Sequence, residues 1–412
     1  MSSLTEKLSS RLEAITPSAI QVIAQTAREL RSAGKDVIDL SIGEPGCNTP
    51  DHIKEAAKAA IDNNITKYTP ANGVPDLRKA IQDKFKRENN LDYDLDEITV
   101  GVGAKQLLFN AILATIDQGD EVIIPAPYWP SYIDMTVLAD GIAKTVICTC
   151  ESNFKLTAKK LESAITANTK WLLLNSPSNP TGEVYSDSEL KSLAKVLLQH
   201  PHVMIMSDDI YEHMIYGGSF HSILNVEPEL KQRTLVINGV SKAYAMTGWR
   251  LGYAAGPKPI INAMNMLQQH SCSHPSSISQ VAAAEALIGD QSTLLQRRTE
   301  LVKKGQLMSK LLNNISGLNS PEPAGAFYLY VSCKHLIDRT TPDGKILQSD
   351  IDVAEYLLRS ANVCTIPGTA FGLSPYLRIS YDTSSDLIKQ SASRIEKSIA
   401  TLKTSPIKKL IK

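Results

Sequence analysis

Short apolar runs alternate with longer segments of helical spacing through the middle of the chain. The runs are rich in β-branched residues and mostly bounded by Gly, Pro, Asn or Asp. They predict strands at residues 98–100, 121–124, 144–147, 171–174, 203–206 and 234–237. Residues 104–116 and 187–198 have the apolar spacing of helices. This alternation predicts an α/β domain on a mainly parallel sheet, with its ligand at the carboxyl ends of the strands. We place this large domain at residues 51–300.

The segments on either side predict a second, smaller unit. Residues 18–33 have the pattern of an amphipathic helix, and residues 297–312 that of a long polar helix. Beyond them the sequence predicts strands at 327–331, 363–366 and 376–381 and a helix at 353–360. We therefore expect a small α+β domain formed by residues 1–50 and 301–412.

The composition narrows the class of ligand. The 412 residues include 43 basic and 43 acidic side chains, so the formal net charge is zero. A nucleic acid or an anionic membrane surface favours a basic excess, and we expect a small molecule instead. Charged residues interrupt the first fifteen positions, where a secretory signal would need an apolar stretch. The six cysteines are scattered, which favours reduced thiols and a cytoplasmic protein.

A glycine-containing turn follows the first strand of the predicted sheet. Gly101, Gly103 and Lys105 lie where a helix would begin, and the free backbone N–H groups of a helix start suit a phosphate. A nicotinamide dinucleotide fingerprint would need a further glycine where this chain has Gln106. A plain turn from strand to helix is the simpler alternative.

The segment 241–250, Ser-Lys-Ala-Tyr-Ala-Met-Thr-Gly-Trp-Arg, follows the strand predicted at 234–237. Lys242 has few carboxylates near it in the sequence, so the pattern suggests an amine of lowered pKa that acts as a nucleophile. Arg250 offers a planar fork of donors for a phosphate. Taken as isolated residues, the two could also be a surface lysine and a structural arginine.

An acidic segment follows the strand predicted at 203–206. A carboxylate such as Asp208 at the end of a buried strand is costly unless it meets a cation, and a protonated pyridine nitrogen would be one. Tyr211 could hydrogen-bond a phenolic oxygen of the same ring. Asp208, Asp209 and His213 could instead hold a metal ion, or the segment could be a solvated turn.

Two further strand ends carry polar or aromatic groups. Asn179 lies in a loop dense in turn-forming residues after the strand predicted at 171–174. Trp129 follows the strand predicted at 121–124. A tryptophan is more often a core residue than a ring stacked on a cofactor. Four strand ends with such features nevertheless favour a ligand site at this edge of the sheet.

Together these residues resemble the class I, fold type I pyridoxal-phosphate aminotransferases. They are most similar to the bacterial aspartate branch, some of whose members also accept prephenate. The resemblance covers residues 15–382. Its motifs are residues 41–45 (SIGEP), 67–70 (KYTP), 103–106 (GAKQ), 127–129 (PYW), 175–182 (NSPSNPTG), 207–213 (SDDIYEH), 241–253, 323–328 (PAGAFY) and 377–381 (LRISY). It implies a large domain with a mainly parallel, seven-stranded sheet and pyridoxal 5'-phosphate as the cofactor.

The resemblance also implies a role for each motif. Lys242 is similar to the lysine that binds the cofactor covalently and moves a proton on the substrate. Asp208 resembles the aspartate that keeps the pyridine nitrogen protonated. The remaining cofactor contacts expected are Trp129 on the ring, Tyr211 and Asn179 on its phenolic oxygen, and Gly103, Ala104, Lys105, Ser241 and Arg250 on the phosphate. Tyr68 from a second subunit would join the phosphate site, which implies a homodimer with shared active sites.

The substrate contacts expected from the resemblance are Arg378 on the α-carboxylate, with Gly43, Trp129 and Asn179 beside it. The expected reaction is ping-pong transamination of aspartate or glutamate with 2-oxoglutarate or oxaloacetate. The second carboxylate of such substrates needs a second cation, for which Lys105 is the candidate, with Ser18 as a neutral donor.

The choice of acceptor and the type of reaction leave alternatives. Members of the resembled branch often carry a lysine where this chain has Thr16, so we expect prephenate to be a poor acceptor. The alternatives are a glutamate- or aspartate-prephenate aminotransferase, a β-lyase on the same fold, and a catalytically silent regulator that binds the cofactor.

Overall fold

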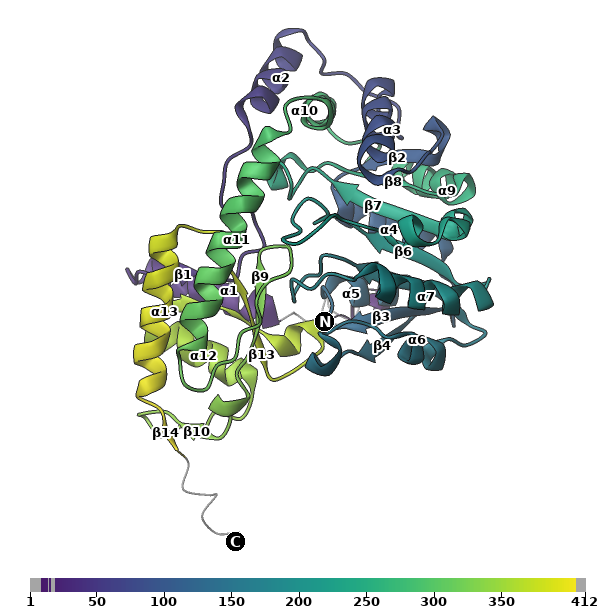
Figure 1. Ribbon diagram of the computed structural model, residues 1–412. Coiled ribbons are helices and arrows are strands. Elements are labelled where there is room, and N and C mark those ends of the chain that lie inside the picture. Colours follow the sequence, from purple (N-terminus) through teal and green to yellow (C-terminus); the bar gives the residue numbers. More distant parts are fainter. Residues whose placement is uncertain (1–8, 14, 16–18, 405–412) are drawn as a thin grey trace, which may run out of the picture.

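The computed structural model describes residues 9–13, 15 and 19–404, which form two lobes (Figure 1). The larger lobe contains a seven-stranded sheet in the order β2-β8-β7-β6-β5-β3-β4. Strand β8 is antiparallel to both neighbours, and the other adjacent pairs are parallel. The strands are β2 (Ile98–Gly101), β3 (Glu121–Ala126), β4 (Ile142–Ile147), β5 (Thr169–Asn175), β6 (Met204–Asp208), β7 (Thr234–Gly239) and β8 (Gly252–Ala255). The predicted α/β fold with a mainly parallel sheet is confirmed.

Strand β8 is the one strand of this sheet that the apolar runs do not predict. Its sequence, Gly-Tyr-Ala-Ala, contains no β-branched residue and so gives little strand signal. Gly252 is needed there because a Cβ atom would lie 2.4 Å from the backbone nitrogen of Ala104. This close approach sets the start of helix α4 (Ala104–Thr115) against β8, the strand next to the edge strand β2.

Helices cover both faces of the large sheet. One face packs with α4, α5 (Ser131–Leu138) and α9 (Lys258–Gln269) in a single apolar cluster. The helices against the other face or beside it are α2 (Asp51–Asp62), α3 (Pro75–Asn89), α6 (Ala158–Ala164), α7 (Asp187–Gln199), α8 (Ile223–Val226) and α10 (Ser277–Ile288). Neighbouring strand residues such as Leu172 and Leu173 belong to opposite clusters. Burial on both faces explains why the strands are continuous apolar runs rather than alternating ones.

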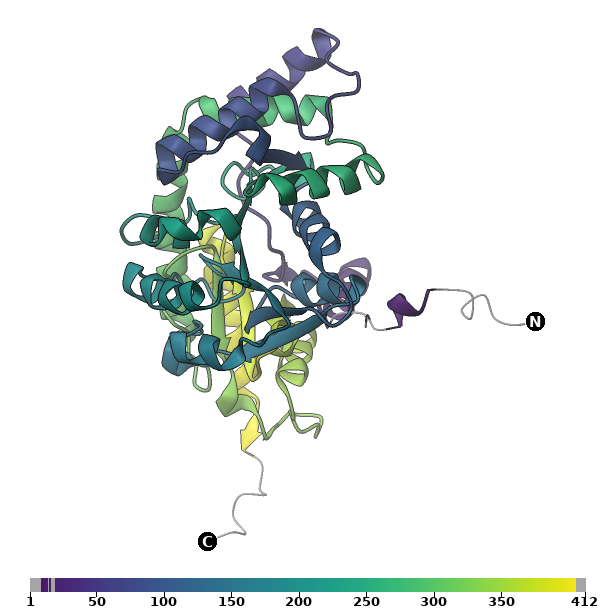
Figure 2. The same cartoon turned by 90° about the vertical axis from the view of Figure 1, so that its right-hand side faces the viewer.

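The smaller lobe is formed by segments from both ends of the described chain. Its three-stranded antiparallel sheet has the order β12-β13-β9, and two short strand pairs, β1 with β11 and β10 with β14, lie beside it. Helix α13 packs along α11 and α12 (Figure 2). The elements are α1 (Ala19–Ser32), β1 (Ile38–Asp39), α11 (Ser292–Asn313), β9 (Tyr328–Ser332), β10 (Arg339–Thr340), α12 (Asp350–Ala361), β11 (Val363–Cys364), β12 (Ile366–Pro367), β13 (Tyr376–Ser380), α13 (Ser385–Ala400) and β14 (Lys403–Thr404).

Helix α11 begins five residues before the predicted start at residue 297 and runs from the large lobe into the small one (Figure 1). Its first turns therefore lie beside the large lobe and its later turns in the core of the small lobe. Among the residues that the structure describes, no helix combines the length and the apolar character that crossing a membrane requires.

Candidate functional site

A cavity of about 580 Å³ lies between the two lobes, at the carboxyl ends of strands β5 and β6. Residues from both lobes line it. The residues of its wall that were predicted from the sequence are Gly43, Ala104, Lys105, Trp129, Asn179, Asp208, Tyr211, Ser241, Lys242, Arg250 and Arg378. The structure thus brings together, at one edge of the sheet, side chains that are widely separated in the sequence.

Lys242 lies in the loop after β7 and points into this cavity. Its Nζ atom donates a hydrogen bond to the backbone oxygen of Gly43 at 2.5 Å. Burial and the nearby guanidinium of Arg378 lower the pKa of Lys242 to about 8. A neutral amine is therefore accessible near neutral pH, as a nucleophilic lysine requires.

Asp208 is the last residue of β6 and is 4% exposed. One carboxylate oxygen accepts a hydrogen bond from the hydroxyl of Tyr132 at 2.7 Å, and the other accepts one from the backbone N–H of Ile210 at 3.3 Å. Burial raises the pKa of Asp208 to about 6, although the Tyr132 hydrogen bond works in the opposite direction. A cationic ligand in the cavity would stabilise its ionised form.

Tyr132 is a site residue that the sequence analysis missed. It lies on α5, three residues after Trp129, and its ring packs edge-on against that tryptophan at 5.3 Å. The sequence shows it as one more aromatic residue of an apolar helix. The sequence carries no signal that would have revealed it, because Trp129 lies in the loop before α5 and the contact with Asp208 joins segments 76 residues apart.

Donor groups that suit an anion lie together where α4 begins. Gly103 precedes the helix with a φ of 80°, and a Cβ atom there would lie 2.6 Å from the Nη2 atom of Arg250. The buried side chain of Ser241 lines the same cavity. A helix N-terminus, a guanidinium and a hydroxyl are the donors that a phosphate group prefers.

Arg378 lies on β13 of the small lobe and is 5% exposed. Its Nη1 atom donates to the side-chain oxygen of Asn179 at 3.0 Å and its Nη2 atom to the backbone oxygen of Ser41. The guanidinium also lies over the ring of Tyr328, 4.8 Å from its centre. Within the described residues, Arg378 forms no ion pair and its buried Nε atom has no hydrogen-bond partner. A carboxylate ligand would supply both the missing negative charge and a hydrogen-bond acceptor for this arginine.

Lys105 and Trp129 form another part of the wall. The ammonium group of Lys105 lies 4.7 Å from the centre of the Trp129 ring, a distance typical of cation–π contacts. Burial and the neighbouring charge of Arg250 lower the pKa of Lys105. The pair presents both a cation and a flat ring to the same cavity.

Three of the predicted site residues are not among those that line the cavity. Gly103 adjoins two residues that do, Ala104 in the chain and Arg250 in space. Tyr68 is 92% exposed and lies beside His274, with the ring centres 5.6 Å apart. It does not line the cavity that contains Lys242. Ser18, like Thr16, lies outside the described residues.

The metal alternative based on Asp208, Asp209 and His213 is wrong. The group of potential metal ligands within the described part of the chain is Glu88, Glu212 and His213, and it excludes both aspartates. The buried amine of Lys84 forms an ion pair with Glu212 in this group. An ammonium ion thus already neutralises the carboxylate that a metal ion would need.

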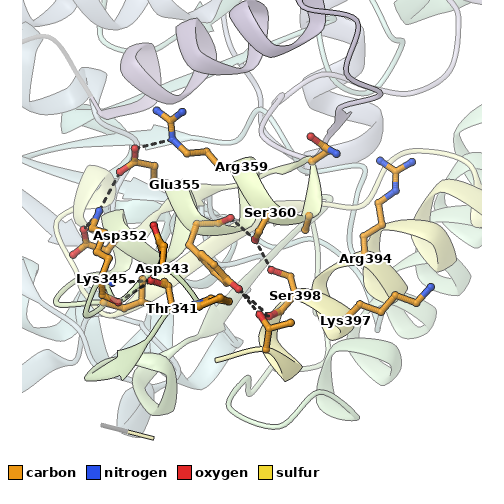
Figure 3. A pocket seen from close by; sticks show the side chains of 16 residues that line it. Thr341, Asp343, Lys345, Asp352, Glu355, Arg359, Ser360, Arg394, Lys397 and Ser398 are labelled. Carbon is orange, nitrogen blue, oxygen red and sulfur yellow. Dashed lines mark hydrogen bonds and ion pairs between the residues drawn. The ribbon is translucent and has the colours of Figure 1, made fainter. Parts of the chain in front are cut away.

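A larger cavity, of about 870 Å³, lies in the small lobe between α12, α13 and β10 (Figure 3). Four of its charged side chains pair with one another: Lys345 contacts Asp352 at 2.8 Å, and Arg359 contacts Glu355 at 3.0 Å. These four groups are also partly exposed to solvent. Arg394 pairs with Asp36 outside the cavity wall, and Lys397 forms no ion pair within the described residues. None of the site residues predicted from the sequence lines this larger cavity, whereas eleven of them line the cavity that contains Lys242, and we place the functional site there.

Comparisons with known proteins agree with that choice. A family model described as "Aminotransferase class I and II" matches residues 35–395. A probable aspartate/prephenate aminotransferase of Rickettsia bellii (strain RML369-C) is 50% identical over 396 residues, which cover 96% of this chain and 99% of the relative. An aspartate aminotransferase of Rhizobium meliloti (strain 1021) is 50% identical over 387 residues, 94% of each chain.

Solved structures of aminotransferases are also similar to this chain. The crystal structure of the aspartate aminotransferase from Rhizobium meliloti has a TM-score of 0.94 and 49% identity, and the match covers 96% of this chain and 99% of that one. The aspartate aminotransferase from Thermus thermophilus with maleate has a TM-score of 0.88 and 38% identity, over 95% and 99% of the two chains. The fold and the site define an enzyme that uses pyridoxal phosphate. The chain belongs to the aminotransferase class I and II family, so the resemblance inferred from the motifs is confirmed.

Proposed function

We propose that this aminotransferase moves the amino group of aspartate, or of glutamate, to 2-oxoglutarate or oxaloacetate by a ping-pong mechanism. The observation that carries the proposal is Arg378, a buried guanidinium that shares a cavity with Lys242 and forms no ion pair within the described residues. A substrate carboxylate would complete it. The names of the relatives, which include aspartate, support the choice of substrate.

The residues present fit pyridoxal phosphate. When bound, this cofactor supplies a carbonyl group that exchanges with amines and a protonated ring that withdraws electrons from the substrate. Asp208 would hold the proton on the ring nitrogen, because burial leaves its carboxylate in need of a cation. Gly103, Ser241 and Arg250 would bind the phosphate, together with the backbone of the first turn of α4. The Trp129 side chain would cover one face of the ring.

Asn179 and Tyr211 would bind the phenolic oxygen of the ring. The side-chain oxygen of Asn179 accepts from Arg378, which leaves its NH₂ group free to donate. The hydroxyl of Tyr211 lies 2.9 Å from that of Tyr328, so either of the two can supply the shared proton. When Tyr328 donates to Tyr211, the Tyr211 proton is available for the cofactor.

Lys242 is the proposed catalytic residue. Its lowered pKa provides the neutral amine that attacks a carbonyl carbon. The same Nζ atom can remove a proton from the substrate Cα and return it, since Arg378 would hold the carboxylate on that carbon in the same cavity. Gly43 contributes the backbone oxygen that keeps the amine oriented when it is unbound.

Lys105 is the proposed partner of the second carboxylate of a dicarboxylic substrate. It is a cation in the cavity wall, and its ammonium group forms no ion pair within the described residues. Ser18 stays a candidate neutral donor on sequence grounds. Prephenate transamination is the second candidate function, because relatives carry that substrate in their names. Thr16 remains the reason to expect prephenate to be the poorer acceptor.

We also propose that the chain forms a homodimer with shared active sites. Tyr68 is exposed and lies outside the cavity of its own chain, as a residue that serves a neighbouring subunit would. Other large apolar side chains are also more than two-fifths exposed in the same part of the large lobe or next to it, namely Ile61, Ile65, Met266, Ile288 and Leu295. Such residues are costly in water and would be covered in an interface.

The proposed domain division is residues 51–300 for the large domain and residues 1–50 with 301–412 for the small one. The hydrophobic clusters support it, because residues 23–40 and 301–399 share one cluster. Tyr211 and Met214 are exceptions, since they come from the large domain and pack in that cluster. Lys242 and Arg378 then lie on different domains, and closing the domains would complete the site.

The test is spectroscopic. Purified protein should be yellow, and its visible band should disappear on addition of aspartate and return on addition of 2-oxoglutarate. Reduction with borohydride should attach the cofactor to Lys242, as shown by peptide mass spectrometry. A colourless protein without this label would refute the proposal. Release of ammonia or sulfide from suitable substrates would point to a β-lyase, and a band insensitive to amino acids to a regulator. A panel of 2-oxoglutarate, oxaloacetate and prephenate then ranks the acceptors.

A further inference from the structure

We propose that Arg297 and Asp382 form a positioning pair that couples the substrate-binding Arg378, on the small lobe, to Lys242 on the large lobe. The inference rests on the proposed function, which gives those two residues their roles. Neither Arg297 nor Asp382 lines the cavity. Both therefore act through the segments they hold and not by contact with the substrate.

Arg297 holds the backbone on which Lys242 is carried. It lies in the first turns of α11, which runs from one lobe to the other (Figure 1), and its side chain is 11% exposed. Its Nη1 atom donates to the backbone oxygen of Lys242 and, at 2.9 Å, to that of Ala243. The guanidinium is planar and rigid. Two successive carbonyls bound to one such group fix the direction in which the Lys242 side chain leaves the backbone.

Asp382 connects the same arginine to the strand that carries Arg378. It follows β13, four residues after Arg378, and its side chain is 4% exposed. Its Oδ2 atom accepts from the Nη2 atom of Arg297 at 3.3 Å, and its Oδ1 atom accepts from Lys304 at 3.1 Å. A displacement of Arg378 by a bound carboxylate is thereby transmitted to Asp382 along the strand and to Lys242 through Arg297.

Asp382 also holds the loop that contacts the Lys242 amine. Its Oδ2 atom accepts from the backbone N–H of Gly46 at 2.9 Å. A Cβ atom at Gly46 would lie 2.1 Å from the backbone oxygen of Asp382, so the two backbones are in close contact. Three residues earlier, the oxygen of Gly43 accepts from the Nζ atom of Lys242. The pair thus fixes Lys242 at both ends: its backbone through Arg297 and its amine through the Gly43–Gly46 loop.

Lys304 provides an internal control. It lies on the same helix as Arg297 and binds the same carboxylate, but it contacts neither the Lys242 backbone nor the cavity. A buried ion pair adds little net stability, since desolvation offsets the attraction. If the cluster served stability only, replacing Lys304 and replacing Arg297 would have similar effects.

The experiment compares Arg297→Met, Asp382→Asn and Lys304→Met with the wild type, all loaded with pyridoxal phosphate. We expect Arg297→Met to lower kcat for aspartate and 2-oxoglutarate by about ten- to a hundredfold with KM changed by no more than about threefold, because a misplaced nucleophile slows the reaction more than it weakens binding. Asp382→Asn should lower kcat by less than Arg297→Met does and by more than Lys304→Met does. Lys304→Met should keep kcat within about threefold of the wild type.

A spectroscopic readout separates positioning from stability. The pH midpoint of the visible band reports the proton on the Lys242–cofactor adduct, and Arg297→Met should shift it while Lys304→Met should not. The charged groups that act on Lys242 are Arg378, Glu44, Arg250, Arg297 and Asp208. Urea unfolding measures the stability of each variant. Arg297→Lys lacks the planar fork whose Nη1 atom binds the two carbonyls while its Nη2 atom binds Asp382, and it should not restore kcat. Equal kcat for Arg297→Met and Lys304→Met, or an unshifted midpoint, would overturn the inference. An inactive wild type would instead refute the proposed function.

Discussion

Replacing Asp208 by Asn should stabilise the cofactor-free protein at pH 8 while abolishing transamination. The carboxyl group of Asp208 has a pKa of about 6 in the folded protein, against an ordinary value of 3.8. The folded state therefore holds a proton that the unfolded state loses. The free energy of unfolding is highest below pH 3.8, falls as the pH rises towards 6, and is constant above that. Asparagine has no proton to lose, so the variant lacks this fall.

The size of the effect follows from the difference between the two pKa values. About two pKa units correspond to about 3 kcal/mol of unfolding free energy. The variant should therefore be about 3 kcal/mol more stable than the wild type at pH 8, with about half of that advantage at pH 5 and none near pH 3. The asparagine side chain would keep an oxygen for the hydroxyl of Tyr132, so the hydrogen bond at 2.7 Å does not reverse the sign.

Urea unfolding of the cofactor-free proteins at pH 5 and pH 8 measures this difference. Asp62→Asn, on the exposed end of α2, is the matched control and should change the unfolding free energy by less than about 1 kcal/mol and by a similar amount at both pH values. Adding pyridoxal phosphate should stabilise the wild type more than Asp208→Asn, because only the wild type offers the ring nitrogen a carboxylate. If the variant is no more stable than the wild type at pH 8, ionisation of Asp208 does not destabilise the cofactor-free protein, and the reasoning from its raised pKa is refuted.

Three further outcomes test the site and the assembly. Lys105→Ala should lower kcat/KM for aspartate by about ten- to a hundredfold and leave that for alanine unchanged in a steady-state assay, since one charged hydrogen bond is worth about 1.5–3 kcal/mol. An equal loss for both substrates would assign Lys105 to the phosphate. Tyr132→Phe should raise the pKa of Asp208 further, because it removes a donor to the ionised carboxylate, so the fall in stability should continue to higher pH in the same urea titration; a fall that still ends near pH 6 would contradict it. Mixing Tyr68→Phe with Lys242→Ala protomers should regain activity through hybrid dimers, and a fully active monomer in light scattering would disprove shared sites.

The parts of the site that the sequence predicts are those with a local signal. A strand end followed by an unusual polar residue is visible in the sequence, and parallel strands bring their carboxyl ends to one edge. Asp208, Asn179 and Lys242 are found in this way from the sequence alone. Arg378 is not, because it comes from the other lobe, 136 residues after Lys242. Only the resemblance to a known family supplied it.

The residues that escaped prediction act through contacts between distant segments. Tyr132 donates to a carboxylate 76 residues away. Arg297 reaches a backbone oxygen 55 residues before it and an aspartate 85 residues after it. In the sequence they are an aromatic residue of an apolar helix and a basic residue of a polar one. Such pairs are formed by the tertiary fold and have no periodicity that would reveal them.

The loop after β6 shows why partners identify a cofactor residue better than sequence position does. Together with the last residue of β6, it carries three buried acids. The amine of Lys84 and neighbouring amides outweigh burial at Glu212 and lower its pKa, so this carboxylate is already neutralised. Burial raises the pKa of Asp209 to about 8, and the hydroxyl of Ser207 is too weak a donor to offset that. Asp209 is therefore mostly protonated at neutral pH and attracts no cation.

Asp208, with a pKa of about 6, is ionised at neutral pH and faces the cavity. Of the three acids, Asp208 is the one that is charged and forms no ion pair within the described residues, and it is therefore the one that a protonated ring would stabilise.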